Sequence, residues 1–217
     1  PSGIQSALSK LGNRILARKH YENLTTLLGE KNAAKIIRHR TSLSPTLLDG
    51  LVRIPDAFRA GPAIAALACD QPVVDYLLYA LEVLARARPD LSERVIRESL
   101  SRQKEGFQVI TWLEGWLRDC PFPKPPFPSD TCIRPIEDLR DLVTFAEAFS
   151  NCLDDNVTQI VAGQRYYYVW RKTGKAVIEL RRDPLIGWRL GDIRGPRNRS
   201  VGSPIYSKIR VHFDGLG

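Results

Sequence analysis

A proline-rich segment in the middle of the chain places the strongest constraint on the fold. Five prolines fall within residues 120–134, in the sequence CPFPKPPFPSDTCIR. Each proline fixes its own φ and lacks the backbone N–H that a helix interior requires, so the segment favours an extended and fairly stiff path. We therefore expect a connector between two regions, with Phe122 and Phe127 lying in surface grooves. A ligand for a proline-binding domain is the alternative.

Residues 1–119 show helical periodicity. Apolar residues recur at intervals of three and four, which predicts amphipathic helices. Gly29 is a helix stop signal, and Pro72 suits a first helical turn. No repeat of fixed length is present, so we expect a helical bundle or array without a named repeat family. The apolar stripes are Leu8, Leu11, Ile15 and Leu16; Tyr21, Leu24, Leu27 and Leu28; Val73, Leu77, Leu78, Leu81 and Leu84; Val95, Ile96 and Leu100; and Val109, Ile110, Leu113 and Leu117.

The period changes in residues 135–217. One more helix is predicted from Pro135 to about Ser150, followed by alternating segments that are typical of strands. The expected fold class is α+β, with a helical N-terminal region and then a small helix-backed antiparallel β-meander. A fourth strand containing Ile205, Ile209 and Val211 is a further expectation. The three strands of the meander are marked by Tyr166, Tyr168 and Trp170; by Ala176, Ile178 and Leu180; and by Trp188, Leu190 and Ile193.

The whole net charge of the chain, +8, is found in its last quarter. Residues 161–217 hold twelve basic and four acidic residues, whereas residues 1–160 hold about twenty of each. A basic region on a neutral body favours a polyanionic partner, because neutralising phosphates releases their counterions. The alternative is a solvated face whose arginines pair with Glu179, Asp183 and Asp192.

The expected nucleic-acid contacts lie on the outer face of the meander and in the turn that follows it. Guanidinium groups there offer planar pairs of donors to phosphates, and an aromatic ring on the same face could stack on a base. Signature motifs of RNA-binding domains are absent, so the pattern does not distinguish DNA from RNA. The predicted residues are Arg171, Arg181 and Arg189 on the strands, Arg194, Arg197 and Arg199 around a Gly-Pro turn, and Tyr167 as the stacking residue.

Catalysis and metal binding receive less support from the sequence. Asp154 and Asp155, together with Glu179 and Arg181, would form a minimal metal-dependent nuclease site, which we keep as an alternative function. No phosphate-binding glycine loop, zinc-protease helix or nucleophile elbow is present. The four cysteines and three histidines do not have the spacing of a zinc site. We therefore expect no metal, no cofactor and reduced thiols, with Cys152 as a buried structural residue.

Residues 151–201 carry a family resemblance. Their outline is a helix ending at Cys152, a turn with Gly163, a strand over residues 176–180 resembling "ATLEL", and a final Gly195 followed by a basic turn with Asn198. Over residues 135–201, about a third of the chain, this outline resembles the C-terminal region of PcfJ-like proteins. These are bacterial proteins of conjugative plasmids, phages and other mobile genetic elements. The resemblance implies a biological context, and it implies no reaction.

Together these features predict a non-enzymatic nucleic-acid-binding or nucleoprotein-complex subunit linked to mobile elements or phage defence. The alternative is a protein-interaction adaptor, in which the helical region is a scaffold and the basic region docks an acidic partner. We expect a cytoplasmic protein without a membrane partner, because no apolar stretch is long enough to span a bilayer and no signal peptide is recognisable. The chain starts at Pro1 and lacks methionine, so we expect it to be part of a longer protein.

Overall fold

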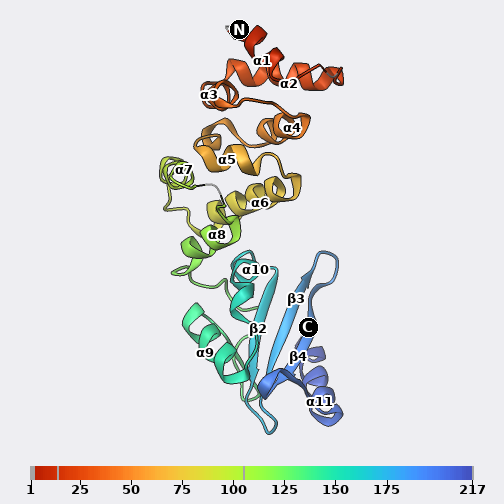
Figure 1. Ribbon diagram of the computed structural model, residues 1–217. Coiled ribbons are helices and arrows are strands. Elements are labelled where there is room, and N and C mark those ends of the chain that lie inside the picture. The colour runs from red at the N-terminus through yellow and green to blue at the C-terminus, as the bar shows by residue number, and fades with distance from the viewer. Residues whose placement is uncertain (1–2, 14, 105, 217) are drawn as a thin grey trace. The chain divides into compact units, whose positions relative to one another are not determined.

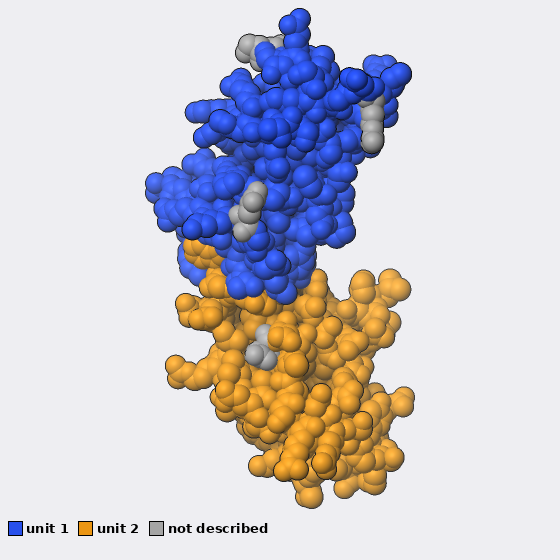
Figure 2. Space-filling view, in the orientation of Figure 1, with its two compact units in different colours: residues 1–112 blue, residues 113–217 orange. Residues whose placement is uncertain are grey.

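The computed structural model describes residues 3–13, 15–104 and 106–216, without the side chain of Asp154 (Figure 1). The chain divides into two compact units, residues 1–112 and residues 113–217 (Figure 2). Unit 1 is helical and unit 2 contains an antiparallel sheet with helices, which confirms the expected α+β class. Within the described ranges, no helix combines the length and the apolar character needed to cross a membrane.

Unit 1 is an array of helices, and Figure 1 shows successive helices packed beside one another. Its core consists of fully buried leucine, isoleucine and alanine side chains, including Leu24, Leu48 and Leu77. The predicted stripes from Tyr21 onwards all lie on helices. The elements are α1 (Ile4–Ser9), α2 (Arg18–Gly29), α3 (Lys31–His39), α4 (Pro45–Arg53), η1 (Asp56–Phe58), α5 (Pro62–Leu67), α6 (Gln71–Ala87), α7 (Glu93–Ser101) and α8 (Val109–Leu117), which continues into unit 2.

The first predicted stripe is wrong. The helix α1 ends at Ser9 instead of continuing to Leu16. Gly12 adopts a left-handed conformation with φ of +73°, which ends helical geometry, and Ile15 is 97% exposed. The apolar spacing alone did not show this break.

Unit 2 is built on a five-stranded antiparallel sheet with the strand order β1-β2-β3-β4-β5. The predicted meander is β2 to β4, with Tyr168 opposite Ile178 and Ile178 opposite Ile193. Gly174, with φ of +81°, lies in the tight turn between the first two of these strands. The elements are β1 (Ile133–Pro135), α9 (Leu139–Phe149), η2 (Asp154–Asn156), α10 (Val157–Val161), β2 (Arg165–Trp170), β3 (Ala176–Asp183), β4 (Gly187–Gly195), η3 (Pro196–Asn198), β5 (Arg199–Ser200) and α11 (Ser203–Asp214).

Helices lie on both sides of this sheet, with α9 and α10 on one side and α11 on the other (Figure 1). On the α11 side, Ile209 and Phe213 pack into one apolar cluster with Tyr166, Tyr168 and Ile178. Tyr168 lies between the rings of Tyr166 and Phe213, at centroid distances of 5.5 and 5.7 Å. The two-sided cover is why β2 has buried residues at five consecutive positions.

Two predictions for unit 2 are wrong: the start of the helix before the sheet, and the strand expected near the end of the chain. Residues 133–135 form the edge strand β1, and α9 begins only at Leu139, where the Oδ1 of Asp138 accepts the N–H of Asp141 at 2.8 Å. The expected fourth strand at Ile205–Val211 is wrong, because this segment is the helix α11. Ile205, Ile209 and Phe213 recur at intervals of four, which is a helical spacing.

The proline-rich connector is packed against the sheet of unit 2. The Oη of Tyr168 accepts the backbone N–H of Phe127 at 2.8 Å and donates to its carbonyl at 2.9 Å. The Phe127 ring contacts Phe213 edge-on at 5.8 Å, and Phe122 is also buried. The connector therefore contributes side chains to the core of this unit.

One glycine in unit 1 allows a close approach between α4 and the end of α5. A Cβ at Gly50 would overlap the carbonyl oxygen of Ala68, whereas a Cβ at Gly29 would meet no atom within 4 Å. We expect Gly50→Ala to destabilise unit 1 by about 1–3 kcal/mol. Gly29→Ala should leave stability unchanged or raise it by about 0.5 kcal/mol. Urea unfolding of both variants checks this, and equal midpoints would contradict the packing described here.

Candidate functional site

A polar pocket of about 230 Å³ lies on the α9 and α10 side of the sheet in unit 2. Its floor comes from β2, β3 and β4, and its rim from the segment after α9 and from η3. Most of its lining side chains carry a charge or an amide. The lining residues are Asn151, Cys152, Leu153, Asn156, Arg165, Tyr167, Val177, Glu179, Arg181, Asp192, Arg194 and Asn198.

A buried carboxylate organises this pocket. Glu179 is 5% exposed, and its Oε1 accepts from the Nη1 of Arg165 at 2.6 Å while its Oε2 accepts from the Nη2 of Arg181 at 2.8 Å. A carboxylate removed from water needs such partners, because its desolvation is otherwise costly. Hydrogen bonding to Glu179 raises the pKa of Arg181 above its ordinary value. One carboxylate faces two guanidinium groups, so this trio keeps one positive charge.

The strand pairing explains why these three side chains meet. Glu179 is opposite Tyr167, and Arg165 is opposite Arg181, so all four project from the same face of β2 and β3. The β3–β4 pairing shifts register between Ile178 and Leu180. Gly191 lies beside this shift, and a Cβ there would come within 3.0 Å of the Glu179 carboxylate and the Arg181 side chain.

Hydrogen bonds tie the rim of the pocket to its floor. The Nη1 of Arg165 also donates to the Oδ1 of Asn156 at 3.1 Å, and the Nδ2 of Asn156 donates to the carbonyl of Cys152 at 3.1 Å. The Nε of Arg194 donates to the Oδ2 of Asp192 at 2.7 Å. Arg165 therefore holds both the carboxylate on the floor and the segment that covers it.

The turn after β4 carries the most available cations beside this pocket. Arg197 and Arg199 are exposed, and neither has a carboxylate partner within the described part of the chain. They flank Asn198, which lines the pocket. Arg197 and Asn198 have φ of +58° and +54°. Asparagine tolerates this left-handed conformation, but for arginine it costs about 1 kcal/mol.

The structure groups some of the predicted contact residues and separates others. Arg181 and Arg194 line the pocket, whereas Arg197 and Arg199 are not among its lining residues and flank Asn198, which is. Arg189 is paired across from Arg181 and lies 3.9 Å from Asp183. Arg171 follows the other end of β2, where its Nη1 donates to the carbonyl of Asp130 at 3.3 Å.

The expectation that Tyr167 lies on a solvated face is wrong. Its side chain is 5% exposed, because the segment after α9 covers this face of the sheet. Burial, reinforced by the nearby Glu179, raises the pKa of Tyr167 to about 12. Its ring is not available to stack on a base.

Sequence reasoning missed several residues of the pocket. Arg165 precedes Tyr167 by two positions, so strand alternation would have placed both on one face. Cys152 was expected to be buried, but its side chain is exposed at the rim. The sequence pattern did not identify Asn151 and Asn156 as site residues, because asparagines after a helix are common in turns.

The acids of the nuclease alternative are not assembled into a site by the described side chains. Asp155 is exposed and does not line the pocket, and the side chain of Asp154 lies outside the described part. Both oxygens of Glu179 are bonded to arginines. The pocket therefore resembles an anion site more than a cation site.

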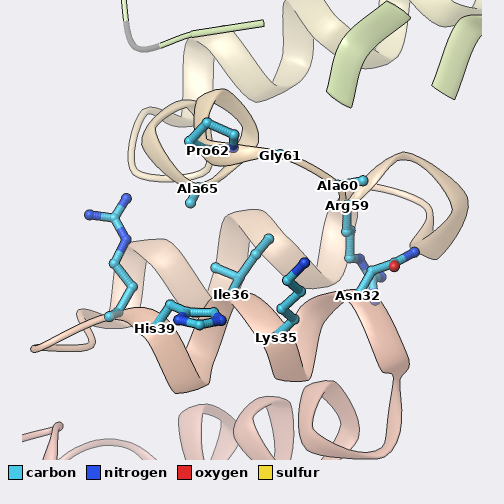
Figure 3. A pocket seen from close by; sticks show the side chains of 10 residues that line it. Asn32, Lys35, Ile36, His39, Arg59, Ala60, Gly61, Pro62 and Ala65 are labelled. Atoms are coloured by element: carbon cyan, nitrogen blue, oxygen red, sulfur yellow. The ribbon is translucent and has the colours of Figure 1, made fainter. Parts of the chain in front are cut away.

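Unit 1 has a separate pocket of about 480 Å³ between α3 and the segment that leads into α5 (Figure 3). Lys35 and His39 face it from α3, with Pro62 and Ala65 opposite. Arg59 also lines it, but its guanidinium is buried and bonded to the carbonyls of Ile54 and Val52 and to Glu30. Burial lowers the pKa of Arg59, whose role is to hold the local fold.

Comparisons with protein-family models, with curated proteins and with solved structures find no match for this chain. A function for this chain must therefore be inferred from its own sequence and structure.

The buried tyrosines make unit 2 sensitive to alkaline pH. Burial raises the pKa of Tyr166, Tyr167 and Tyr168 above the ordinary value of 10, to about 12 for Tyr167. Below pH 10 these phenols are neutral in both the folded and the unfolded chain, so they do not make the free energy of unfolding depend on pH. Between pH 10 and 12 the unfolded chain loses these protons first, and stability falls by about 2–3 kcal/mol from Tyr167 alone.

Ultraviolet titration of the seven tyrosines checks this expectation. Tyr166, Tyr167 and Tyr168 should ionise only when unit 2 unfolds, and the Tyr167→Phe variant should show one fewer tyrosine of this kind. Reversible ionisation of all seven near pH 10 in the folded chain would contradict the burial of this strand.

Proposed function

We propose that this chain is a non-enzymatic nucleic-acid-binding subunit, which contacts phosphates through the arginines around the unit 2 pocket. One observation carries the proposal. Arg197 and Arg199 are exposed and lack carboxylate partners in the described part of the chain. They flank Asn198, which lines a pocket where three arginines face two carboxylates. Excess guanidinium around a concave surface favours a phosphate ligand.

The paired arginines of the pocket can still bind phosphate. A guanidinium has five N–H donors, and Arg181 uses one of them on Glu179 while its side chain stays 47% exposed. Arg194 uses its Nε on Asp192 and is 41% exposed. The carboxylates hold these side chains in place, which reduces the entropy lost when a phosphate binds.

Such a surface suits binding to the backbone of a nucleic acid. Tyr167 is buried, so this pocket has no ring for base stacking. Phosphate contacts position a nucleic acid without reading its sequence. We therefore expect binding that is largely independent of sequence and strongly dependent on salt, for DNA and RNA alike.

The resemblance to PcfJ-like proteins extends this proposal to a context. Of the positions that define the resemblance, Cys152, Glu179 within residues 176–180, and Asn198 line the same pocket, whereas Gly163 and Gly195 do not. This convergence supports the idea that the pocket is the working part of unit 2. We accordingly propose a cytoplasmic nucleoprotein component of mobile elements or of phage defence.

A second candidate is an adaptor that docks an acidic protein. Leu185 and Ile186, at the tip of the β3–β4 hairpin, are 94% and 73% exposed. Their backbone N–H groups are held by the Oδ1 of Asp183, so the tip has a defined turn. An exposed apolar pair beside Arg182 and Arg189 favours a protein partner with an acidic rim.

Salt titration of DNA binding tests the first candidate. We expect Arg197→Gly combined with Arg199→Ala to weaken binding to a labelled DNA strand by about 10- to 100-fold. The slope of log K against log salt should fall by about 1–2. Arg197→Gly alone should raise the stability of unit 2 by about 1 kcal/mol, since glycine tolerates the positive φ.

Lys208→Ala combined with Arg210→Ala is the matched control. Both are exposed cations of α11, on the other side of the sheet, so their loss removes the same two positive charges without touching the pocket. Binding that ignores salt, or that falls equally in the control, would refute the proposal. A protein partner retained after nuclease treatment and lost in Leu185→Ser would support the adaptor. Magnesium-dependent cleavage lost in Glu179→Gln would support the nuclease alternative.

A further inference from the structure

Three potential metal ligands meet beside the start of the edge strand β1. Asp130 and Cys132 come from the connector, and His212 comes from α11. One ligand atom from each lies within 4.8 Å of the other two. Cys132 and His212 are 80 residues apart in the sequence, which is why their spacing predicted no site.

The aspartate is fixed by its own turn. Its Oδ1 accepts the backbone N–H groups of Cys132 and Ile133 at 2.6 and 2.7 Å, and this leaves Oδ2 directed at His212. The carboxylate therefore has one oxygen that its own turn does not use.

The histidine is fixed by aromatic packing. Its ring meets Trp170 and Phe213 edge-on, with centroids 5.7 and 5.9 Å away. Its Nε2 lies 2.9 Å from the Oδ2 of Asp130, but the two atoms lack the alignment of a hydrogen bond. Among the described residues, this buried nitrogen has no hydrogen-bond partner. An ion shared between the two atoms would satisfy both.

The cysteine completes a donor set. Cys132 is a free, half-buried thiol directly before β1, and its carbonyl accepts the N–H of Arg171 at 2.8 Å. This bond fixes its backbone to the sheet. One sulfur, one imidazole nitrogen and one carboxylate oxygen form a mixed set that suits Zn²⁺, with a fourth position for water.

We propose that Asp130, Cys132 and His212 form a zinc site that fastens the connector to α11. Ligand atoms around one tetrahedral zinc ion are about 3.3–3.8 Å apart. The Cys132 sulfur therefore needs to approach the other two atoms by at most about 1 Å, whereas Nε2 and Oδ2, which are 2.9 Å apart, need to separate slightly. On binding, the thiol gives its proton to solvent and no electron is transferred. Two anionic ligands, carboxylate and thiolate, balance the charge of the ion. The site is independent of the polar pocket and of the function proposed for it.

Cobalt and zinc titrations of the untagged, reduced full chain test this site. We expect one Co²⁺ per chain, with a thiolate-to-metal charge-transfer band and the visible bands of a four-coordinate ion. Cys132→Ser should abolish the charge-transfer band, whereas Cys69→Ser and Cys152→Ser, at two exposed thiols, should keep it. Zinc should displace cobalt and raise the melting temperature.

Asp130→Asn separates metal binding from folding. An asparagine Oδ1 can accept the same two backbone N–H bonds, but its amide nitrogen cannot replace the Oδ2 ligand. We expect this variant to melt like the parent chain without metal and to bind zinc at least tenfold more weakly. No charge-transfer band in the parent chain, or a band that survives in Cys132→Ser, would overturn the proposal and leave an Asp130–His212 ion pair.

Discussion

Unit 2 depends on the hydrogen bonds between the desolvated carboxylate of Glu179 and two arginines. Where a helix or loop covers the sheet, a charged side chain that is buried under the cover, such as Glu179, must find a partner there. Arg165 and Arg181 supply these partners from the neighbouring strand and from two residues further along β3. Arg165 then binds Asn156 and so fixes the covering segment. The pocket is polar because the charged side chains of this face are held in ion pairs.

This arrangement also explains the distribution of charge in unit 2. Carboxylates hold Arg165, Arg181 and Arg194, and the turn after β4 leaves Arg197 and Arg199 free within the described residues. The alternative of internal pairing therefore describes Arg181, Arg189 and Arg194, which lie next to Glu179, Asp183 and Asp192. The paired arginines build the pocket and exceed its carboxylates by one charge, and Arg197 and Arg199 add two further charges in the turn beside it.

The sequence was informative where local periodicity decides the structure. The helices α2, α6, α7 and α8 and the strands β2 to β4 follow from apolar spacing and from turn residues such as Gly174. The faces of the sheet did not follow, because alternation was interpreted with one buried face. Five consecutive buried residues in β2 indicate two buried faces, and Tyr167 was misplaced for that reason. His212 reaches Asp130 only through the packing of α11 on the sheet, a long-range contact that no local pattern encodes.

The edges of the sheet set a limit on how unit 2 can meet other molecules. β1 has three residues and contains Pro135, and β5 has two residues. The β1 edge therefore offers few free backbone groups to an incoming strand, because it is short and its proline lacks a donor. β5 pairs with only Arg194 and Gly195, so residues 187–193 of β4 have no strand on their outer side among the described residues. Strand addition by a partner, or by a second copy of the sheet, is therefore disfavoured at β1 and would have to use β4.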